Sequence, residues 1–154
     1  MRRYIRMWTT MLTVVCGASL ALGHCQIPCG IYGDSTRFTL MREHVTTIEK
    51  SMKEIQRLGK EKSPNHNQLT RWVINKDAHA DELAEIVTYY FMAQRIKPSA
   101  EGSSEAVQRK YVDQISLLHR ILVLSMKAKQ TTDLQHCKQM RTLIDKFEKL
   151  YAGK

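Results

Sequence analysis

The sequence predicts an all-α protein, an antiparallel four-helix bundle preceded by an N-terminal metal-binding hook. Three observations favour this fold. Apolar residues recur at spacings of three and four over four separate segments. The connections between these segments are short, as in antiparallel bundles. The strand signals, an alternating apolar run or an Asn-Gly or Asp-Gly hairpin, do not occur.

Residues 1–23 have the pattern of a removable export signal. Three arginines precede an apolar run over 11–22, and Ala21 and Gly23 supply small residues at the −3 and −1 positions of a cut before His24. The run is shorter than the roughly 20 apolar residues that a bilayer span requires. An uncleaved anchor helix and a propeptide removed by a dedicated protease stay open as alternatives. We expect no stable membrane anchor after processing, and a periplasmic or secreted protein, or a cytoplasmic one if the segment is a propeptide.

The remaining residues, 24–154, suffice for one compact domain. The chain has 24 Lys and Arg against 15 Asp and Glu; loss of the three signal arginines leaves 21 against 15, a formal charge of +6. This charge favours anionic partners or substrates. The basic residues are scattered and form no groove-reading motif, so nucleic acid is not an expected partner.

The first helix is expected to begin at a cap formed by Asp34 or Ser35 and to end near Gly59. The second is expected from about Asn67 to Ile96, where Lys97-Pro98 stops it. Their predicted inner faces comprise Phe38, Met41, Val45, Ile48, Met52 and Ile55 in the first helix, and Leu69, Trp72, Val73, Ala80, Leu83, Val87, Tyr90 and Phe91 in the second.

The third helix has two apolar rows, which favours burial against other subunits as well as within the bundle. The fourth is expected to begin at a capping box, Thr132-Asp133-Leu134-Gln135, so that the bundle covers residues 35–152. The rows of the third helix are Val107, Tyr111, Ile115, Leu118 and Leu122, and Leu117, Ile121 and Leu124; the fourth helix has Leu134, Cys137, Met140, Ile144, Phe147 and Tyr151.

Cysteine use argues against a disulfide-stapled protein. Cys16 would leave with the signal, so Cys25, Cys29 and Cys137 remain, an odd number for an exported chain. Cys137 lies within a helical pattern and is expected to be buried. A disulfide between Cys25 and Cys29 stays open.

The hook, residues 24–32, carries the chemistry. A cut after Gly23 would give a chain that starts with a free amine on His24, followed by Cys25 and, after a Cys-x-x-x-Cys spacing, Cys29. The amine, the deprotonated amide of Cys25 and two thiolates can lie in one plane around a metal, with the imidazole as an axial ligand. Planar nitrogen and sulfur ligation suits Ni(II) or Cu(II) better than tetrahedral zinc.

The hook resembles that of the nickel superoxide dismutases, whose members are four-helix bundles. The resemblance is specific because the motif must also become the N-terminus. It covers the mature chain in length and helix order, and the matching signature residues are His24, Cys25, Pro28, Cys29, Gly30 and Tyr32.

The resemblance implies one nickel ion per subunit, held by the amine and imidazole of His24, the amide nitrogen and thiolate of Cys25 and the thiolate of Cys29. It implies that Tyr32 lines the approach of superoxide, and that Ni(III)/Ni(II) cycling yields dioxygen and hydrogen peroxide. It also implies a homo-oligomer, with a hexamer as precedent. Family members support the axial imidazole with a glutamate and an arginine, and the corresponding positions here hold Met41 and His79.

His79 could orient His24 or simply be solvated, and both alternatives stay open. The other helical histidines, His44, His66, His119 and His136, have no metal-ligand spacing among themselves and are expected on the surface or in the core. Two further hypotheses remain for the whole chain: a non-catalytic exported binding protein with a Cys25–Cys29 disulfide, and a metal carrier that uses the hook without turnover.

Overall fold

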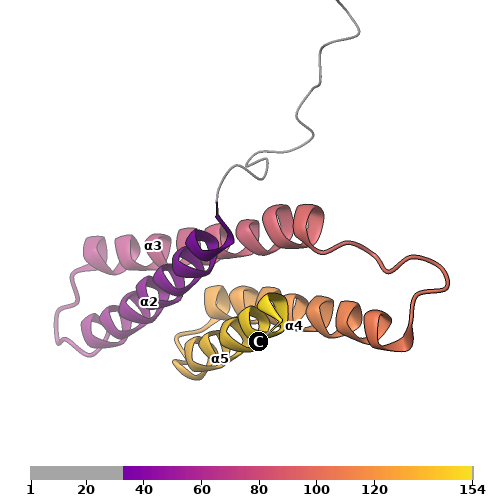
Figure 1. The fold of residues 1–154 in the computed structure, drawn as a ribbon. Coiled ribbons are helices and arrows are strands. Elements are labelled where there is room, and N and C mark those ends of the chain that lie inside the picture. Colours follow the sequence, from indigo (N-terminus) through magenta and orange to yellow (C-terminus); the bar gives the residue numbers. More distant parts are fainter. Residues whose placement is uncertain (1–32, 154) are drawn as a thin grey trace, which may run out of the picture.

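The computed structural model describes residues 33–153, which form an antiparallel helical bundle without strands (Figure 1). The predicted fold class is thereby confirmed for the bundle. The hook and the segment 1–23 lie outside the described residues. The helices are α2 (Asp34–Leu58), α3 (His66–Glu85), the π-helix η1 (Ile86–Arg95) that continues α3, α4 (Glu105–Gln130) and α5 (Gln135–Ala152).

The bundle consists of two helical hairpins packed on each other. α2 packs on α3 and α4 on α5, while α3 contacts α4 and α2 contacts α5. The far end of η1 and the first part of α4 extend beyond the start of α2 and the end of α5 (Figure 1). This projection leaves Val107 and Val112, near the start of α4, more than half exposed, at 52% and 60%.

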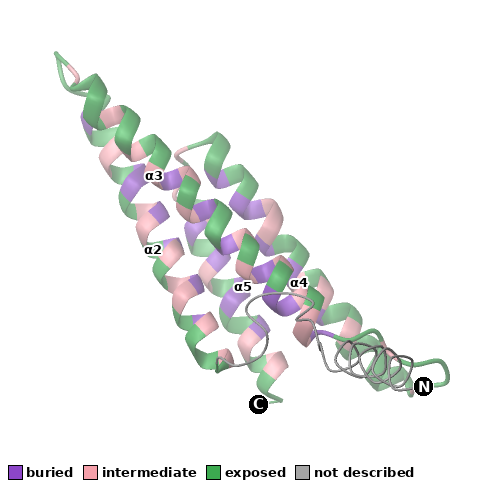
Figure 2. Ribbon diagram, turned by 90° about the horizontal axis from the view of Figure 1, so that it is seen from above, coloured by how far each residue is buried: buried purple, intermediate pink, exposed green. Residues whose placement is uncertain are grey.

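Buried residues follow the sides of the helices that face one another (Figure 2). At the end of the bundle where α2 begins, Phe38 of α2, Phe91 of η1, and Phe147 and Tyr151 of α5 form an aromatic cluster with ring centroids 4.9–5.9 Å apart. Such contacts stabilise beyond area burial alone. All four helical segments contribute to one continuous core.

The predicted caps of the first and fourth helices are wrong. Gly33 occupies the N-cap of α2 without a side-chain hydrogen bond, and Asp34 is already helical. The capping box from Thr132 does not form at α5. Instead, Asp133 Oδ1 accepts a hydrogen bond from the backbone N–H of Gln135 at 2.9 Å. The carboxylate of Asp133 therefore satisfies a donor that the sequence pattern assigned to a hydroxyl.

The second helix has the expected extent but not a uniform geometry. It begins at His66, with Asn65 as a cap that accepts a hydrogen bond from Gln68 N at 3.1 Å. From Ile86 onward it is a π-helix, which differs from the uniform α-helix that the sequence pattern predicts. Residues five apart are aligned in a π-helix, so Arg95 lies over Tyr90. The Arg95 guanidinium carbon is 5.0 Å from the centroid of that ring.

The predicted inner faces are only partly correct. Val73 of α3 and Val107 of α4 are exposed, whereas Leu118, Ile121 and Leu124 of the two predicted α4 rows are buried. Cys137 is fully buried and free, as expected. None of the described helices combines the length and apolarity needed to cross a membrane.

Candidate metal centre

The described residues begin directly after the hook. The expected ligands His24, Cys25 and Cys29, and the expected substrate-lining Tyr32, therefore lie outside them. The structure describes the end of the bundle where the hook joins α2, and the positions that the resemblance assigns to the supports of the axial ligand. The start of α2 and the positions of Met41 and His79 are therefore the described parts of the chain that concern the metal centre.

Asp34, two residues after Tyr32, is held by side chains from two other helices. Its Oδ1 accepts a hydrogen bond from the hydroxyl of Tyr90 and lies 3.0 Å from Arg95 Nε. Its Oδ2 accepts a hydrogen bond from the hydroxyl of Tyr151 at 2.8 Å. Arg95 also donates to the Tyr90 hydroxyl at 2.9 Å. We call these four residues the Asp34 cluster; it ties the first turn of α2 to η1 and α5.

The ionisation of the cluster follows from these contacts. Burial acts to raise the pKa of Asp34, but the hydrogen bonds from Tyr90 and Tyr151 and the charge of Arg95 outweigh it and lower the pKa. Burial and the bond to Asp34 raise the pKa of Tyr151 to about 12. The pKa of Tyr90 is raised by the same two causes. Near neutral pH the cluster is thus a carboxylate held by two neutral phenols and a guanidinium.

Beside this cluster, a cleft of about 230 Å³ opens between α2 and the α3–η1 segment. Its lining combines both charge signs with aromatic and apolar groups. The lining residues are Arg37, Leu40, His44, Glu82, Glu85, Ile86, Tyr89 and Tyr90. Tyr90 belongs to both features, so the cleft begins next to the first turn of α2, which follows the hook in the sequence.

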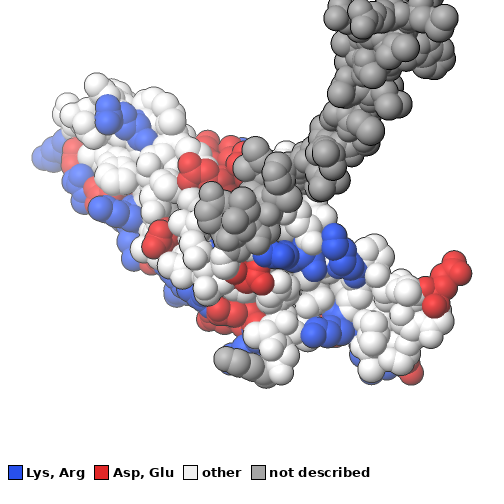
Figure 3. Space-filling view, turned by 45° about the horizontal axis from the view of Figure 1, so that its top comes forward, with Lys and Arg blue, Asp and Glu red and all other residues white. Residues whose placement is uncertain are grey.

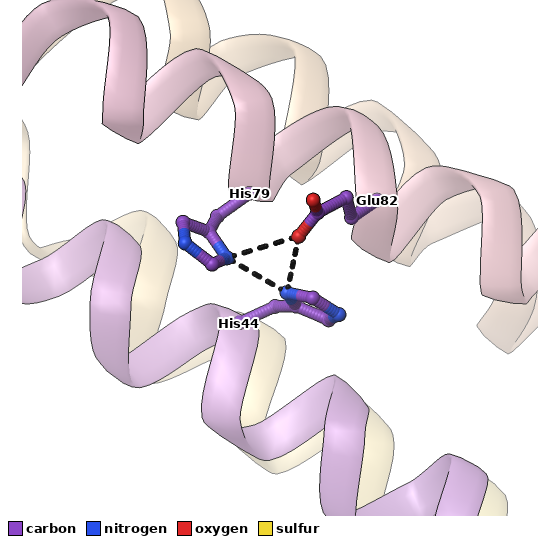
Figure 4. Close-up of side chains that lie close together, drawn as sticks. All are labelled: His44, His79 and Glu82. Carbon is purple, nitrogen blue, oxygen red and sulfur yellow. Dashed lines mark hydrogen bonds and ion pairs between the residues drawn. The ribbon is translucent and has the colours of Figure 1, made fainter.

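At the other end of the cleft, His44 of α2 meets His79 and Glu82 of α3 (Figure 4). The two Nδ1 atoms are 2.9 Å apart, and Glu82 Oε2 lies 3.2 Å from His44 Nδ1 and 3.1 Å from His79 Nδ1. We call these three residues the histidine triangle. Burial, together with the charge of His79, lowers the pKa of His44 against the opposing effect of Glu82.

Met41 and His79, the two positions that the resemblance assigns to supports of the axial ligand, therefore lie in different environments. Met41 is fully buried in the core and presents no polar atom to the cleft. His79 is partly exposed and belongs to the histidine triangle. No sequence spacing pairs His44 with His79, since they are 35 residues apart on different helices. The spacing of His79 and Glu82 on one helix face was the only local signal.

Comparison with known proteins decides the family. A family model described as nickel-containing superoxide dismutase matches residues 19–154, which includes the whole hook motif and the whole bundle. The chain belongs to this family. Searches of curated proteins and of solved structures gave no match.

Family membership establishes the activity class. The chain is a nickel-dependent superoxide dismutase, an oxidoreductase whose substrate is superoxide. On the face drawn in Figure 3, basic side chains form several separate groups with acidic side chains between them. A small anion would therefore meet alternating potentials over this face rather than one broad basic patch.

Proposed function

We propose that the chain performs superoxide dismutation at residues 24–32, after a cut between Gly23 and His24 creates the terminal amine. One nickel ion per subunit would be held by His24, Cys25 and Cys29. The observation that carries this proposal is the Asp34 cluster. Three side chains hold the residue that stands two positions after the signature Tyr32, so the chain just after the hook is fastened to η1 and α5.

The donor set fits nickel. Two thiolates, a deprotonated amide and an amine are anionic or strongly donating ligands that favour planar coordination, and zinc prefers tetrahedral sites. When bound, nickel would supply one-electron cycling between Ni(III) and Ni(II), which converts one superoxide to dioxygen and another, with two protons, to hydrogen peroxide. The thiolates bring the potential into range because their negative charge stabilises the higher oxidation state.

The remaining roles fall to the chain itself. The imidazole of His24 would be a further nickel ligand, and Tyr32 would line the approach of superoxide. Residues 24–33 are long enough to reach any part of the cleft: ten residues extend up to about 33 Å, whereas Asp34 and His44 are separated by about 15 Å along α2. Near-diffusional capture of the substrate would be helped by the positive net charge of the processed chain.

Two properties of the whole protein belong to the same proposal. We infer a homo-oligomer, with a hexamer as the family precedent, because Val107 and Val112 expose apolar surface on the projecting first part of α4. We also infer export to the periplasm or the medium through segment 1–23. A non-catalytic protein with a Cys25–Cys29 disulfide is the alternative, and membership in an enzyme family argues against it.

The test combines mass mapping of the mature N-terminus, nickel analysis and superoxide turnover. We expect a chain that begins at His24, nickel near one per chain, and loss of both nickel and activity in Cys29→Ser. Cys137→Ser is the matched control, because this thiol is buried in the bundle core and is not one of the proposed ligands, so its replacement should leave nickel content unchanged. One residue retained before His24 in the active enzyme, or turnover preserved in Cys29→Ser, would contradict the proposal.

A further inference from the structure

We propose that His44, His79 and Glu82 bind a divalent transition-metal cation such as Zn²⁺ between α2 and α3. This site uses none of the hook residues and does not depend on the proposed function. Its three ligand atoms form a nearly equilateral triangle with edges of 2.9, 3.1 and 3.2 Å (Figure 4). The same atoms converge from two helices that pack along their length.

The edges of the triangle match the distances between neighbouring ligand atoms around a bound metal ion. Nitrogen and oxygen ligands bind Zn²⁺ at about 2.0–2.2 Å. Two such ligands lie about 3.0 Å apart at a right angle and about 3.4 Å apart at the tetrahedral angle that zinc prefers, so the observed edges fit the first arrangement and would widen by a few tenths of an ångström for the second. The cation would then lie just outside the plane of the triangle, with further positions open to water.

Without a cation, the three contacts cannot all be favourable. A neutral imidazole carries one hydrogen, so two histidines can direct at most two hydrogens into the triangle, and an ionised carboxylate brings none. At least one of the three edges then joins two lone pairs or two N–H groups. A cation near the centre makes all three atoms ligands at once, with each Nε2 carrying the hydrogen.

The donor types select the class of metal. Two imidazole nitrogens and one carboxylate oxygen form a set used by catalytic zinc sites, whereas Mg²⁺ and Ca²⁺ require mainly oxygen ligands. No thiol belongs to the triangle, which separates this site chemically from the hook. The site is also accessible: the side chains of His44, His79 and Glu82 are 13%, 29% and 52% exposed.

The experiment uses the full chain with Cys25→Ser and Cys29→Ser, so that the hook lacks its thiolates. Zn²⁺ and Co²⁺ are titrated by calorimetry and visible absorption. We expect one Zn²⁺ per chain, a Co²⁺ spectrum without thiolate charge-transfer bands, and a melting temperature raised by saturating Zn²⁺. Millimolar Mg²⁺ should not compete. Circular dichroism checks folding, and the wild-type chain with alkylated thiols serves as a second preparation.

Variants of the triangle then locate the site. His44→Ala, His79→Gln and Glu82→Gln should each weaken Zn²⁺ binding at least about tenfold and abolish the thermal shift. The matched controls are Glu85→Gln, a second carboxylate of the same cleft, and His119→Ala, an exposed histidine of α4. Both should bind as the parent does. This inference is overturned if the chain with Cys25→Ser and Cys29→Ser does not bind Zn²⁺, or if the control variants lose binding equally. Failure of the hook proposal would instead appear only in the nickel content and turnover of the unaltered enzyme.

Discussion

The hydroxyl of Tyr151 donates a hydrogen bond to Asp34 Oδ2 at 2.8 Å, joining the last turn of α5 to the first residue of α2. These residues are 117 positions apart. The bond belongs to the Asp34 cluster, which the projecting η1 completes through Tyr90 and Arg95. The C-terminal helix thus helps to hold the chain directly after the hook.

Tyr151→Phe should weaken this attachment while leaving the aromatic cluster in place. We expect about 1 kcal/mol lower unfolding free energy, the usual net value of one hydrogen bond. We also expect lower nickel retention during dialysis against a chelator, because the chain that directly follows the hook is less firmly held. Denaturant titration and metal analysis measure the two effects. Tyr89→Phe is the control, since Tyr89 is largely exposed, and equal behaviour of both variants would argue against a role for the bond.

The Asp34 cluster should make stability fall at acid pH. The pKa of Asp34 is lower in the folded protein than its ordinary value of 3.8, so its ionised form is favoured by folding. Its contribution is fully present above 3.8 and is lost as the pH falls below that value through the folded pKa. Denaturant midpoints compared between wild type and Asp34→Asn should converge in this acid range. A gap that stays constant through it would contradict the assignment.

Lys76 should stabilise the end of α4. Its side chain is only 3% exposed, and Nζ donates to the carbonyl oxygens of Ala128 and Lys129 at 2.7 and 2.6 Å and contacts Asp77 at 2.8 Å. Lys76→Met keeps the length but leaves these carbonyls without the charge that matches the helix C-terminus. We expect a loss of about 1–3 kcal/mol by denaturant titration.

The control for this prediction is Lys146→Met on α5. Lys146 is exposed, so the same chemical change there should alter the unfolding free energy by less than about 0.5 kcal/mol. If both variants lose the same stability, the buried hydrogen bonds of Lys76 contribute nothing specific.

Cys137 should be unreactive in the folded protein. Burial is the main cause that raises its pKa to about 11, so the thiol is neutral at pH 8 and its sulfur is inaccessible. In the chain with Cys25→Ser and Cys29→Ser, a thiol-specific chromogenic reagent should react with Cys137 only after unfolding in guanidinium. Rapid reaction under native conditions would show that the α5 core opens readily. The thiols of Cys25 and Cys29 should differ from that of Cys137, since the proposed nickel site requires them to be deprotonated.

Much of the fold could be predicted because its signals are local. The stripe from Phe38 to Met52 predicts a helix and its buried face, since residues three and four apart share a side of any α-helix. The turn at Pro64 and the stop at Pro98 are equally local. The caps were predicted less well: Asp34 and Asp133 are both cap-forming types, and only packing decides whether such a carboxylate binds its own helix or another one.

The sequence by itself determined the four helices, the apolar stripes that pack them and the family, through a motif whose chemistry lies within nine consecutive residues. The tertiary structure decided what meets across the helices. It brought His44 to His79, attached Asp34 to Tyr151, and used the π-register of η1 to align Arg95 with Tyr90. The physical reason is that side-chain contacts between helices depend on packing register and helix winding, and these are settled by the whole core rather than by any one segment.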